Sequence, residues 1–440
     1  MQTYFNQLAT DLHTHTTSDE VFLATLSAEQ SNFVRFNKNK VRQAGSVKQV
    51  LLTISLIKNQ RRAERTLTLV GDAFLDLPQC AATLDTLRQI LSALPEDPYL
   101  IYNTVPASSR KVGESALPSD ADMLDEIIAN GQGRDLVGIF ASGTIYKGFA
   151  NSLGQRNWHQ VDNFNFDWCL YHAADKAVKN SYAGTHWDSA ELRHKMQSPI
   201  TQLNMLARPA KTLTPGQYRA YLTPSALNEV ISLLSWGGFG EKSQRNKQSP
   251  LIKLQDGTAS LNSRVTITEA ASAGVAAMFN ADGFTKANTV ALIAAGKHAG
   301  ALVSPRTAQE FTITTNGANS SEAPEAIDML GGSLKRDEVL ATLNNGLLIS
   351  NLWYLNYSDR QGCRMTGMTR FATFWVEDGE IVAPVNVMRF DDSIYRMLGT
   401  NLVDLTCERD WLLDAGSYGE RSTGAAKLPG AMIDGFQLTL

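Results

Sequence analysis

Strand-like segments recur in both halves of this 440-residue sequence, and they constrain the fold more than any other feature. Near the start, segments rich in Val, Leu, Ile, Thr and Phe are separated by two polar turns, Asn37–Lys40 and Lys58–Arg62. This pattern is typical of an antiparallel meander, and it predicts strands at Glu20–Leu26, Asn32–Phe36, Ser46–Leu56 and Arg65–Val70. Strand-like alternation returns at Asp135–Phe149 and Asn157–His172, on either side of a turn at Asn151–Gln155.

Other segments have helical spacing. At the start of the chain, Tyr4, Leu8 and Leu12 recur every four residues, which places them on one face of a short helix. A serine followed by acidic residues is a helix N-terminus signal, and together with the apolar spacing it predicts a helix at Ser119–Ala129. That helix and a second one at Leu75–Leu94 are expected to pack on the first sheet.

The length of the chain exceeds what one hydrophobic core usually organises, so we expect two domains. A predicted helix at Asp188–Leu206 is followed by a segment with two prolines and a glycine, Ala207–Tyr218, which is the best linker candidate. Beyond it, strands dominate again. The sequence therefore predicts an α+β protein, with an N-terminal α/β domain at 1–210 and a C-terminal, mostly β domain at 211–440.

Composition excludes several classes of protein. Forty basic and forty-four acidic side chains give a formal charge of −4, which offers no overall attraction to a phosphate backbone or an anionic membrane. The N-terminus lacks the pattern of a secretory signal, and no uncharged apolar run reaches the roughly 18 residues of a membrane span. The four cysteines are widely spaced, without a CxxC pair. We expect a cytoplasmic protein that binds neither nucleic acid nor membrane directly.

Two groups of residues invite a metal-site hypothesis. The DxHxH pattern of Asp11, His13 and His15 would put two imidazoles on one face of a strand, and it is similar to the opening motif of PHP-type phosphoesterases. The alternative is a solvated helix end that carries two histidines. The second group is Cys169, His172, His186 and His194. These residue types bind zinc, but their spacing matches no familiar zinc module. The alternative is a buried thiol near polar histidines.

The usual catalytic motifs are absent from the sequence. A zinc peptidase normally carries two histidines one helical turn apart, with a glutamate that polarises the metal-bound water. Neither HExxH nor HExxxH occurs, nor does a GxSxG elbow, a P-loop or a GxGxxG after a strand. Local motifs therefore assign no reaction, and we assign no catalytic, cofactor-binding or metal-ligating residue.

An ordered series of segments resembles the TldD/PmbA family, known as peptidases and as the "modulator of DNA gyrase" group. In the first half, the resemblance rests on a hairpin, an NSxG turn and a PGxY passage: Val34–Gln43, Asn151–Gln155 and Pro215–Pro224. In the second half, it rests on segments similar to the family's GLLI, TG(L/M)TR, VExGEI and terminal blocks: Asn345–Ile349, Thr366–Arg370, Val376–Ile381 and Leu428–Phe436. The order of these blocks carries more weight than any one of them.

The resemblance implies a two-domain protein that dimerises around a cleft where peptide is held and cut. In the catalytic branch of the family, HExxxH lies on the helix after the PGxY passage, and a later cysteine completes the zinc site. Here that helix, Ser225–Trp236, contains no histidine, and its one carboxylate, Glu229, is given no catalytic role. Neither Cys363 nor Cys407 lies in an obvious ligand context. This departure is similar to the PmbA, or TldE-like, branch.

Three hypotheses follow. The first is a zinc-free subunit of a metallopeptidase that processes small or unfolded peptides, inactive alone, with zinc only in a TldD-type partner. The second is a stand-alone homodimer that binds peptide or regulates, without peptidase activity. The third, more remote, is a metal-dependent phosphoesterase that uses Asp11, His13 and His15.

Overall fold

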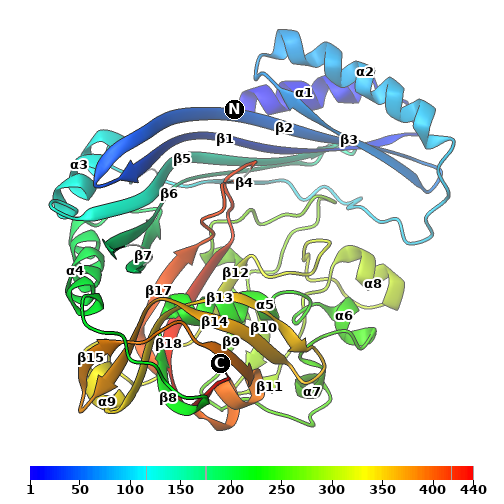
Figure 1. The fold of residues 1–440 in the computed structure, drawn as a ribbon. Helices are drawn as coiled ribbons and strands as arrows, with labels where there is room; N and C mark the ends of the chain where they lie inside the picture. Colours follow the sequence, from blue (N-terminus) through cyan, green and yellow to red (C-terminus); the bar gives the residue numbers. More distant parts are fainter. Residues whose placement is uncertain (115, 174–175, 418, 440) are drawn as a thin grey trace.

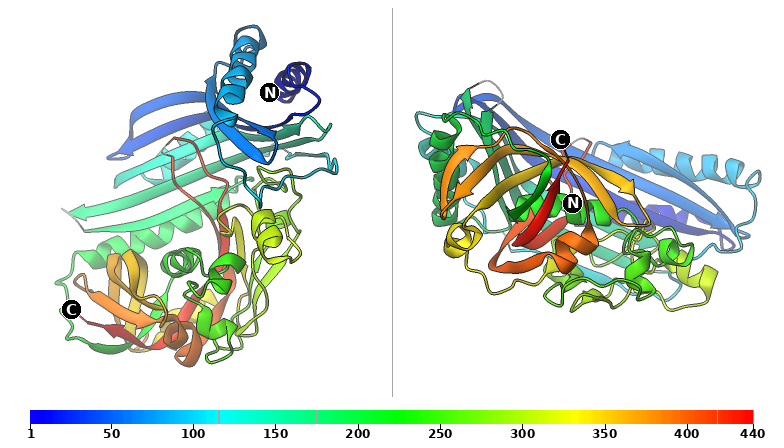
Figure 2. Two further views of the ribbon diagram at one scale, coloured as in Figure 1. Left: turned by 90° about the vertical axis from the view of Figure 1, so that its right-hand side faces the viewer. Right: turned by 60° about the horizontal axis from the view of Figure 1, so that its bottom comes forward.

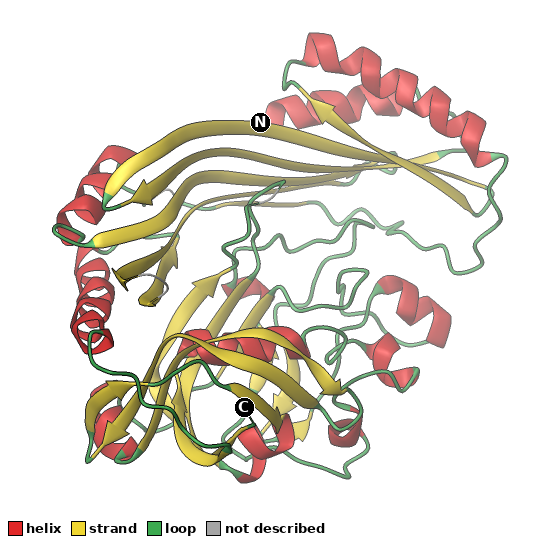
Figure 3. Ribbon diagram, in the orientation of Figure 1, coloured by secondary structure: helices red, strands yellow, loops and turns green. Residues whose placement is uncertain are grey.

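The computed structural model describes residues 1–440 with the exception of 115, 174–175, 418 and 440. Two sheets dominate the described chain, and their strands come from separate halves of the sequence (Figures 1 and 3). This arrangement confirms the predicted α+β class. The expected boundary near Lys211 falls between α4 (Ser189–Leu206), which begins after the first sheet, and β8 (Gly216–Leu222), which opens the second. That the halves fold independently stays a prediction.

The first sheet has the order β3-β2-β1-β5-β6, and β4 and β7 both pair with β6. Neighbouring strands are antiparallel, except that β4 runs parallel to β6. Its strands in the described chain are β1 (Val21–Asn37), β2 (Lys40–Lys58), β3 (Arg61–Leu69), β4 (Ser109–Val112), β5 (Asp135–Asn151), β6 (Arg156–Ala173) and β7 (Lys176–Gly184).

A single long strand replaces two that the sequence predicted. We expected Glu20–Leu26 and Asn32–Phe36 to be separate, but β1 continues through both and pairs with β2 along its whole length. The polar residues between them are not a turn. Glu29 and Ser31 are buried, and the Ser31 hydroxyl donates a hydrogen bond of 2.7 Å to the Glu29 carboxylate. These two polar residues therefore form a buried hydrogen bond and do not mark a solvent-exposed turn.

Helices lie at both ends of this sheet (Figure 1). α1 (Gln2–Thr14) and α2 (Ala73–Leu91) lie at one end, with α3 (Asp120–Asn130) and α4 at the other. The predicted cap of α3 is confirmed, because the Ser119 hydroxyl accepts a hydrogen bond from a backbone N–H of the first turn. Even-numbered side chains of β6 pack beneath both helix pairs: Trp158 near α1, and Phe164, Phe166 and Trp168 in the core that includes α3 and α4.

The second half is built on a larger sheet, whose order is β11-β10-β9-β12-β18-β16-β14-β13-β8. β15 and β17 pair with β14 and β18, and β8 also pairs with β18, so β8, β13, β14, β16 and β18 close into a ring. Besides β8, its described strands are β9 (Ile267–Glu269), β10 (Val290–Ala294), β11 (Lys297–His298), β12 (Ala326–Met329), β13 (Gly346–Asp359), β14 (Arg364–Glu377), β15 (Glu380–Pro384), β16 (Arg389–Ser393), β17 (Leu402–Leu413) and β18 (Ala425–Leu438).

Helix α5 (Pro224–Leu234) packs its apolar face into the core of this ring, mainly against β13 and β18. The remaining α-helices of the described chain are short: α6 (Glu241–Arg245), α7 (Ile252–Gln255), α8 (Pro305–Phe311) and α9 (Val339–Leu343). The connection between β17 and β18 reaches from the second half to the first sheet (Figures 1 and 2). No helix among the described residues is long and apolar enough to cross a membrane.

Candidate functional site

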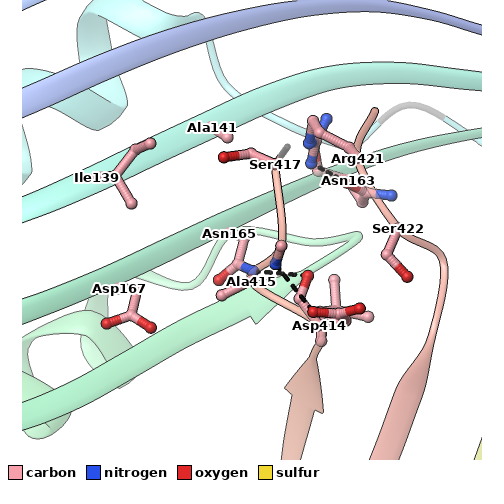
Figure 4. Close-up of a pocket in the computed structure, with 12 residues that line it drawn as sticks. Ile139, Ala141, Asn163, Asn165, Asp167, Asp414, Ala415, Ser417, Arg421 and Ser422 are labelled. Carbon is pink, nitrogen blue, oxygen red and sulfur yellow. Dashed lines mark hydrogen bonds between the residues drawn. The ribbon is translucent and has the colours of Figure 1, made fainter. Parts of the chain in front are cut away.

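Strand β6 has one apolar and one polar face, and the polar face lies toward the second half of the chain. Because successive side chains of a strand point to opposite faces, the residues that alternate with Phe164, Phe166 and Trp168 share the polar face. They are Asn163, Asn165, Asp167 and Cys169. The first three line a small hollow together with residues of β5 and of the β17–β18 connection (Figure 4).

The β17–β18 connection closes one side of this hollow, and we call its described residues, 414–417 and 419–424, the arm. The Asn165 side-chain amide donates a hydrogen bond of 3.3 Å to the carbonyl of Asp414 in the arm. Arg421, at 6% exposure, donates to the backbone carbonyl of Asn163 at 3.1 Å, to the Asn163 side chain, and to the Ser31 hydroxyl. Burial lowers the pKa of the Arg421 guanidinium to about 10, although Glu29 and Asp120 oppose the shift. The arm thus fixes the second half against the first sheet.

Lys179 of β7 lies beside this polar face. Its ammonium nitrogen is 3.1 Å from a carboxylate oxygen of Asp167 and 5.9 Å from the centroid of the Phe371 ring on β14. Burial raises the pKa of the Asp167 carboxyl, and Lys179 partly offsets that rise. Burial also raises the pKa of the Cys169 thiol to about 11, so this cysteine is a weak nucleophile.

The outer face of α5 also lies near Lys179, and we call the region around Lys179 that β6, β7, β14 and α5 border the cleft. Thr223 caps the helix by accepting a hydrogen bond from the Ala226 N–H, and proline at the first position suits a helix start. The outer face carries only polar side chains: Ser225, Asn228, Glu229 and Ser232. Glu229 is exposed to solvent, yet the protein surrounding the cleft raises the pKa of its carboxyl by desolvation, which Lys179 opposes.

A cavity of about 420 Å³ opens between α4, β7 and the start of α5. Its charged lining is largely neutralised internally, because Asp410 is 3.2 Å from the Lys195 ammonium and 2.5 Å from the Arg336 guanidinium. Burial favours the neutral form of Asp410, but these two cations hold its pKa below the ordinary value. Lys179 lines this cavity as well, so it joins the cavity to the hollow of Figure 4 through Asp167.

The residues of the DxHxH pattern lie at the end of α1, so the premise that they occupy a strand is wrong. His13 is in the last helical turn and His15 is the C-cap, and both side chains are exposed. The His15 ring nitrogen is 3.4 Å from the Asp11 carboxylate. This matches the alternative of a solvated helix end with two histidines.

The second predicted group is spread over several elements. Cys169 lies on the polar face of β6, whereas His172, His186 and His194 are exposed on β6, after β7 and on α4. Across the described residues, no group of three His, Cys, Asp or Glu side chains is arranged to hold a metal ion. Sequence reasoning missed Asp167, Lys179 and Arg421. The alternation along β6 offered a sequence signal for Asp167, whereas no sequence signal marked Lys179 or Arg421.

Comparisons with known proteins agree with this architecture. A model of the family described as "PmbA/TldA metallopeptidase C-terminal domain" matches residues 215–440. The whole chain resembles the crystal structure of TldE from Thermococcus kodakarensis, with a TM-score of 0.78, 12% identity, and coverage of 99% of this chain and 100% of that one. No curated protein sequence matches the chain.

Two further solved structures, each described as a modulator of DNA gyrase, share the fold. The one from Thermotoga maritima has a TM-score of 0.76 and 13% identity, and the match covers 99% of this chain and 100% of that one. The one from Bacteroides thetaiotaomicron has a TM-score of 0.73 and 13% identity, over 99% and 98% of the two chains. Such identities establish the fold alone, but the family model covers more than half of the sequence. The chain belongs to the TldD/PmbA family of metallopeptidase-like proteins.

Proposed function

We propose that this chain is the zinc-free, TldE-like subunit of a peptidase complex, and that it holds peptide in the cleft around Lys179. The observation that carries the proposal is the outer face of α5. The catalytic branch of the family carries HExxxH on this helix, whereas here the face that reaches the cleft presents serine, asparagine and Glu229. Without metal-ligating histidines beside it, Glu229 has no metal-bound water to polarise.

Strand addition is the mode of peptide binding that we propose. Within the described chain, β7 pairs with β6 on one side and with no other strand, and it borders the cleft beside β14. An unpaired strand edge offers backbone N–H and C=O groups to an extended peptide, and the side chains around it supply specificity. A partner subunit that carries zinc would then cut the peptide held here.

The proposal places the complex in the cytoplasm, without contact to nucleic acid or membrane. Supporting it, all four cysteines are free thiols, as a reducing compartment favours, and the sequence carries a small net negative charge.

The test is to purify the full chain alone and after co-expression with a TldD-type protein, then to measure zinc content and cleavage of an unfolded peptide on the same samples. We expect zinc and cleavage in the complex and neither in the lone chain. A lone chain that forms a homodimer, binds peptide and leaves the activity of the TldD-type protein unchanged would instead favour the stand-alone regulator. Stoichiometric zinc in the lone chain would refute the zinc-free assignment.

A further inference from the structure

The guanidinium of an arginine on β14 lies over two aromatic rings. The guanidinium carbon of Arg370 on β14 is 4.5 Å from the ring centroid of Trp353 and 5.1 Å from that of Phe371. Tyr354 packs edge-on against Trp353, at 4.7 Å between centroids. Contact with two rings stabilises the positive charge of the guanidinium and uses none of its N–H donors.

Among the residues that the structure describes, the guanidinium of Arg370 makes no hydrogen bond and no salt bridge, unlike that of Arg364. Two other arginines of the same hairpin differ in this respect. Arg364 is paired with Asp391 at 2.5 Å. Arg360 also stacks on an aromatic ring but donates to two backbone carbonyls. Arg370 is therefore oriented by its neighbours without being neutralised by them.

The backbone around this group is strained. Tyr354 and Phe371 have φ angles of 59° and 56°, in the left-handed region that bulky residues avoid. Both lie where the pairing of β13 and β14 is interrupted by bulges. Strained bulges aim side chains in directions that a regular strand does not allow, and they cluster at functional sites. Here one strained residue, Tyr354, follows Trp353, and the other, Phe371, follows Arg370, so both adjoin the residues in contact.

Arg370 lies close to Lys179, β7 and the polar face of β6. Phe371 is the ring that the Lys179 ammonium approaches, and β14 packs against β7. The charge of Arg370 also reaches Cys169 on the polar face of β6, where it opposes the effect of burial on that thiol. Arg370 therefore lies beside the β7 edge to which the peptide is proposed to add.

We infer that Arg370 binds a carboxylate of the peptide held in this cleft; the inference rests on the proposed function and deepens it. A guanidinium with a free edge forms two parallel hydrogen bonds with a carboxylate. A single negative charge suits the site, because Asp167 and Glu229 lie in the same cleft and would repel a dianion more strongly. The carboxylate is either the C-terminus of the peptide or an Asp or Glu side chain.

The test uses titration calorimetry on the full chain, alone and in complex with a TldD-type partner. Three N-acetylated six-residue peptides of Ala, Val and Thr are compared: one with a free C-terminus, one with a C-terminal amide, and an amide with one internal Glu. We expect a carboxylate to strengthen binding about tenfold over the plain amide. Tight binding of the free acid alone identifies the chain end, and equal binding of the Glu peptide identifies the side chain.

The Arg370→Gln variant should bring all three peptides to within about twofold of each other. Arg364→Gln is the matched control, because that arginine lies on the same strand and is already paired, and it should keep the preference. If wild type binds acid and amide equally, or if Arg370→Gln keeps the preference, the inference fails while peptide binding by the chain stands. If no peptide binds to the chain or the complex, the proposed function fails and the inference with it.

Discussion

The two faces of the first sheet differ in what their side chains do, although the same strand supplies both. On β6, Phe166 and Trp168 are fully buried beneath helices and stack at 4.3 Å. The residue between them, Asp167, lies on the opposite face and pairs with Lys179. Burial of apolar area stabilises the first face. On the second face, burial of charge costs free energy that its partners only partly offset.

This difference indicates which residues of the first sheet can change without loss of the fold. The helix-covered face determines whether the sheet forms. Around Lys179, the cleft face holds polar side chains that contribute little to stability and are positioned by the fold behind them, as expected of a binding site on a rigid element. Mutations on the two faces should therefore separate stability from ligand binding.

The largest effect is expected on the apolar face. Phe166→Ala removes a fully buried ring that also packs edge-on against Phe36 and Phe140, and it should lower the free energy of unfolding by about 3–5 kcal/mol. Chemical denaturation measures this. The matched control is Asn165→Ala, one position before on the cleft face, where loss of the hydrogen bond to the arm should cost about 1 kcal/mol. Equal losses at both positions would contradict the assigned difference between the faces.

A smaller effect is expected where the arm meets the cleft face. Arg421→Met keeps the length of the side chain but removes its donors to Asn163 and Ser31 and leaves Glu29 buried without that nearby cation. We expect a loss of about 2–3 kcal/mol, together with faster amide hydrogen exchange in the arm and in the middle of β1.

The control for this prediction is Glu420→Gln, because Glu420 is half-exposed and lies 3.6 Å from Lys147. Exposed ion pairs contribute little, so this change should cost less than about 1 kcal/mol. Unchanged exchange in β1 of the Arg421→Met variant would show that the arm does not hold the two halves together.

The sequence predicted strand-like alternation along β6, but neither the polar face of that strand nor the contacts that cross between the halves. Alternation of aromatic and polar residues along β6 is a local signal, as are the cap at Ser119 and the missing histidines of α5. The continuity of β1 was missed because its polar middle is buried by Arg421, which is 390 positions from Ser31. A contact of that separation leaves no pattern in either segment.

The group around Arg370 was missed for a different reason. The segment Thr366–Arg370 was identified as part of a family block, but its arginine gave no sign of being unpaired. Phe371 and Tyr354 are aromatic residues that favour regular strands, so nothing local predicts their left-handed conformation. It occurs where bulges interrupt the pairing of β13 with β14, which is a tertiary feature.

The smallest effect is expected on the cleft face itself, where the contribution of Asp167 to stability should change with pH in a defined direction. Burial raises the pKa of Asp167 above its ordinary value of 3.8, so the folded state binds this proton more readily than the unfolded state. The contribution of Asp167 to stability is therefore fully present below pH 3.8 and is lost as the pH rises through the raised pKa. Asp167→Asn removes this dependence but leaves Lys179 without its partner, so the net change at pH 7 should be within about 1 kcal/mol.

Denaturation of the wild type and of the Asp167→Asn variant between pH 7 and pH 4 checks the direction of this change. The wild type should gain stability relative to Asp167→Asn as the pH falls, because the carboxyl takes up its proton preferentially in the folded state. Lys179→Met separates the two causes of the shift: without the ammonium that opposes it, the effect of burial on Asp167 should grow and the same gain should begin at a higher pH. A wild type that instead loses stability against Asp167→Asn on acidification would mean that the pair with Lys179 outweighs burial, and the cleft face would then stabilise the fold as the apolar face does.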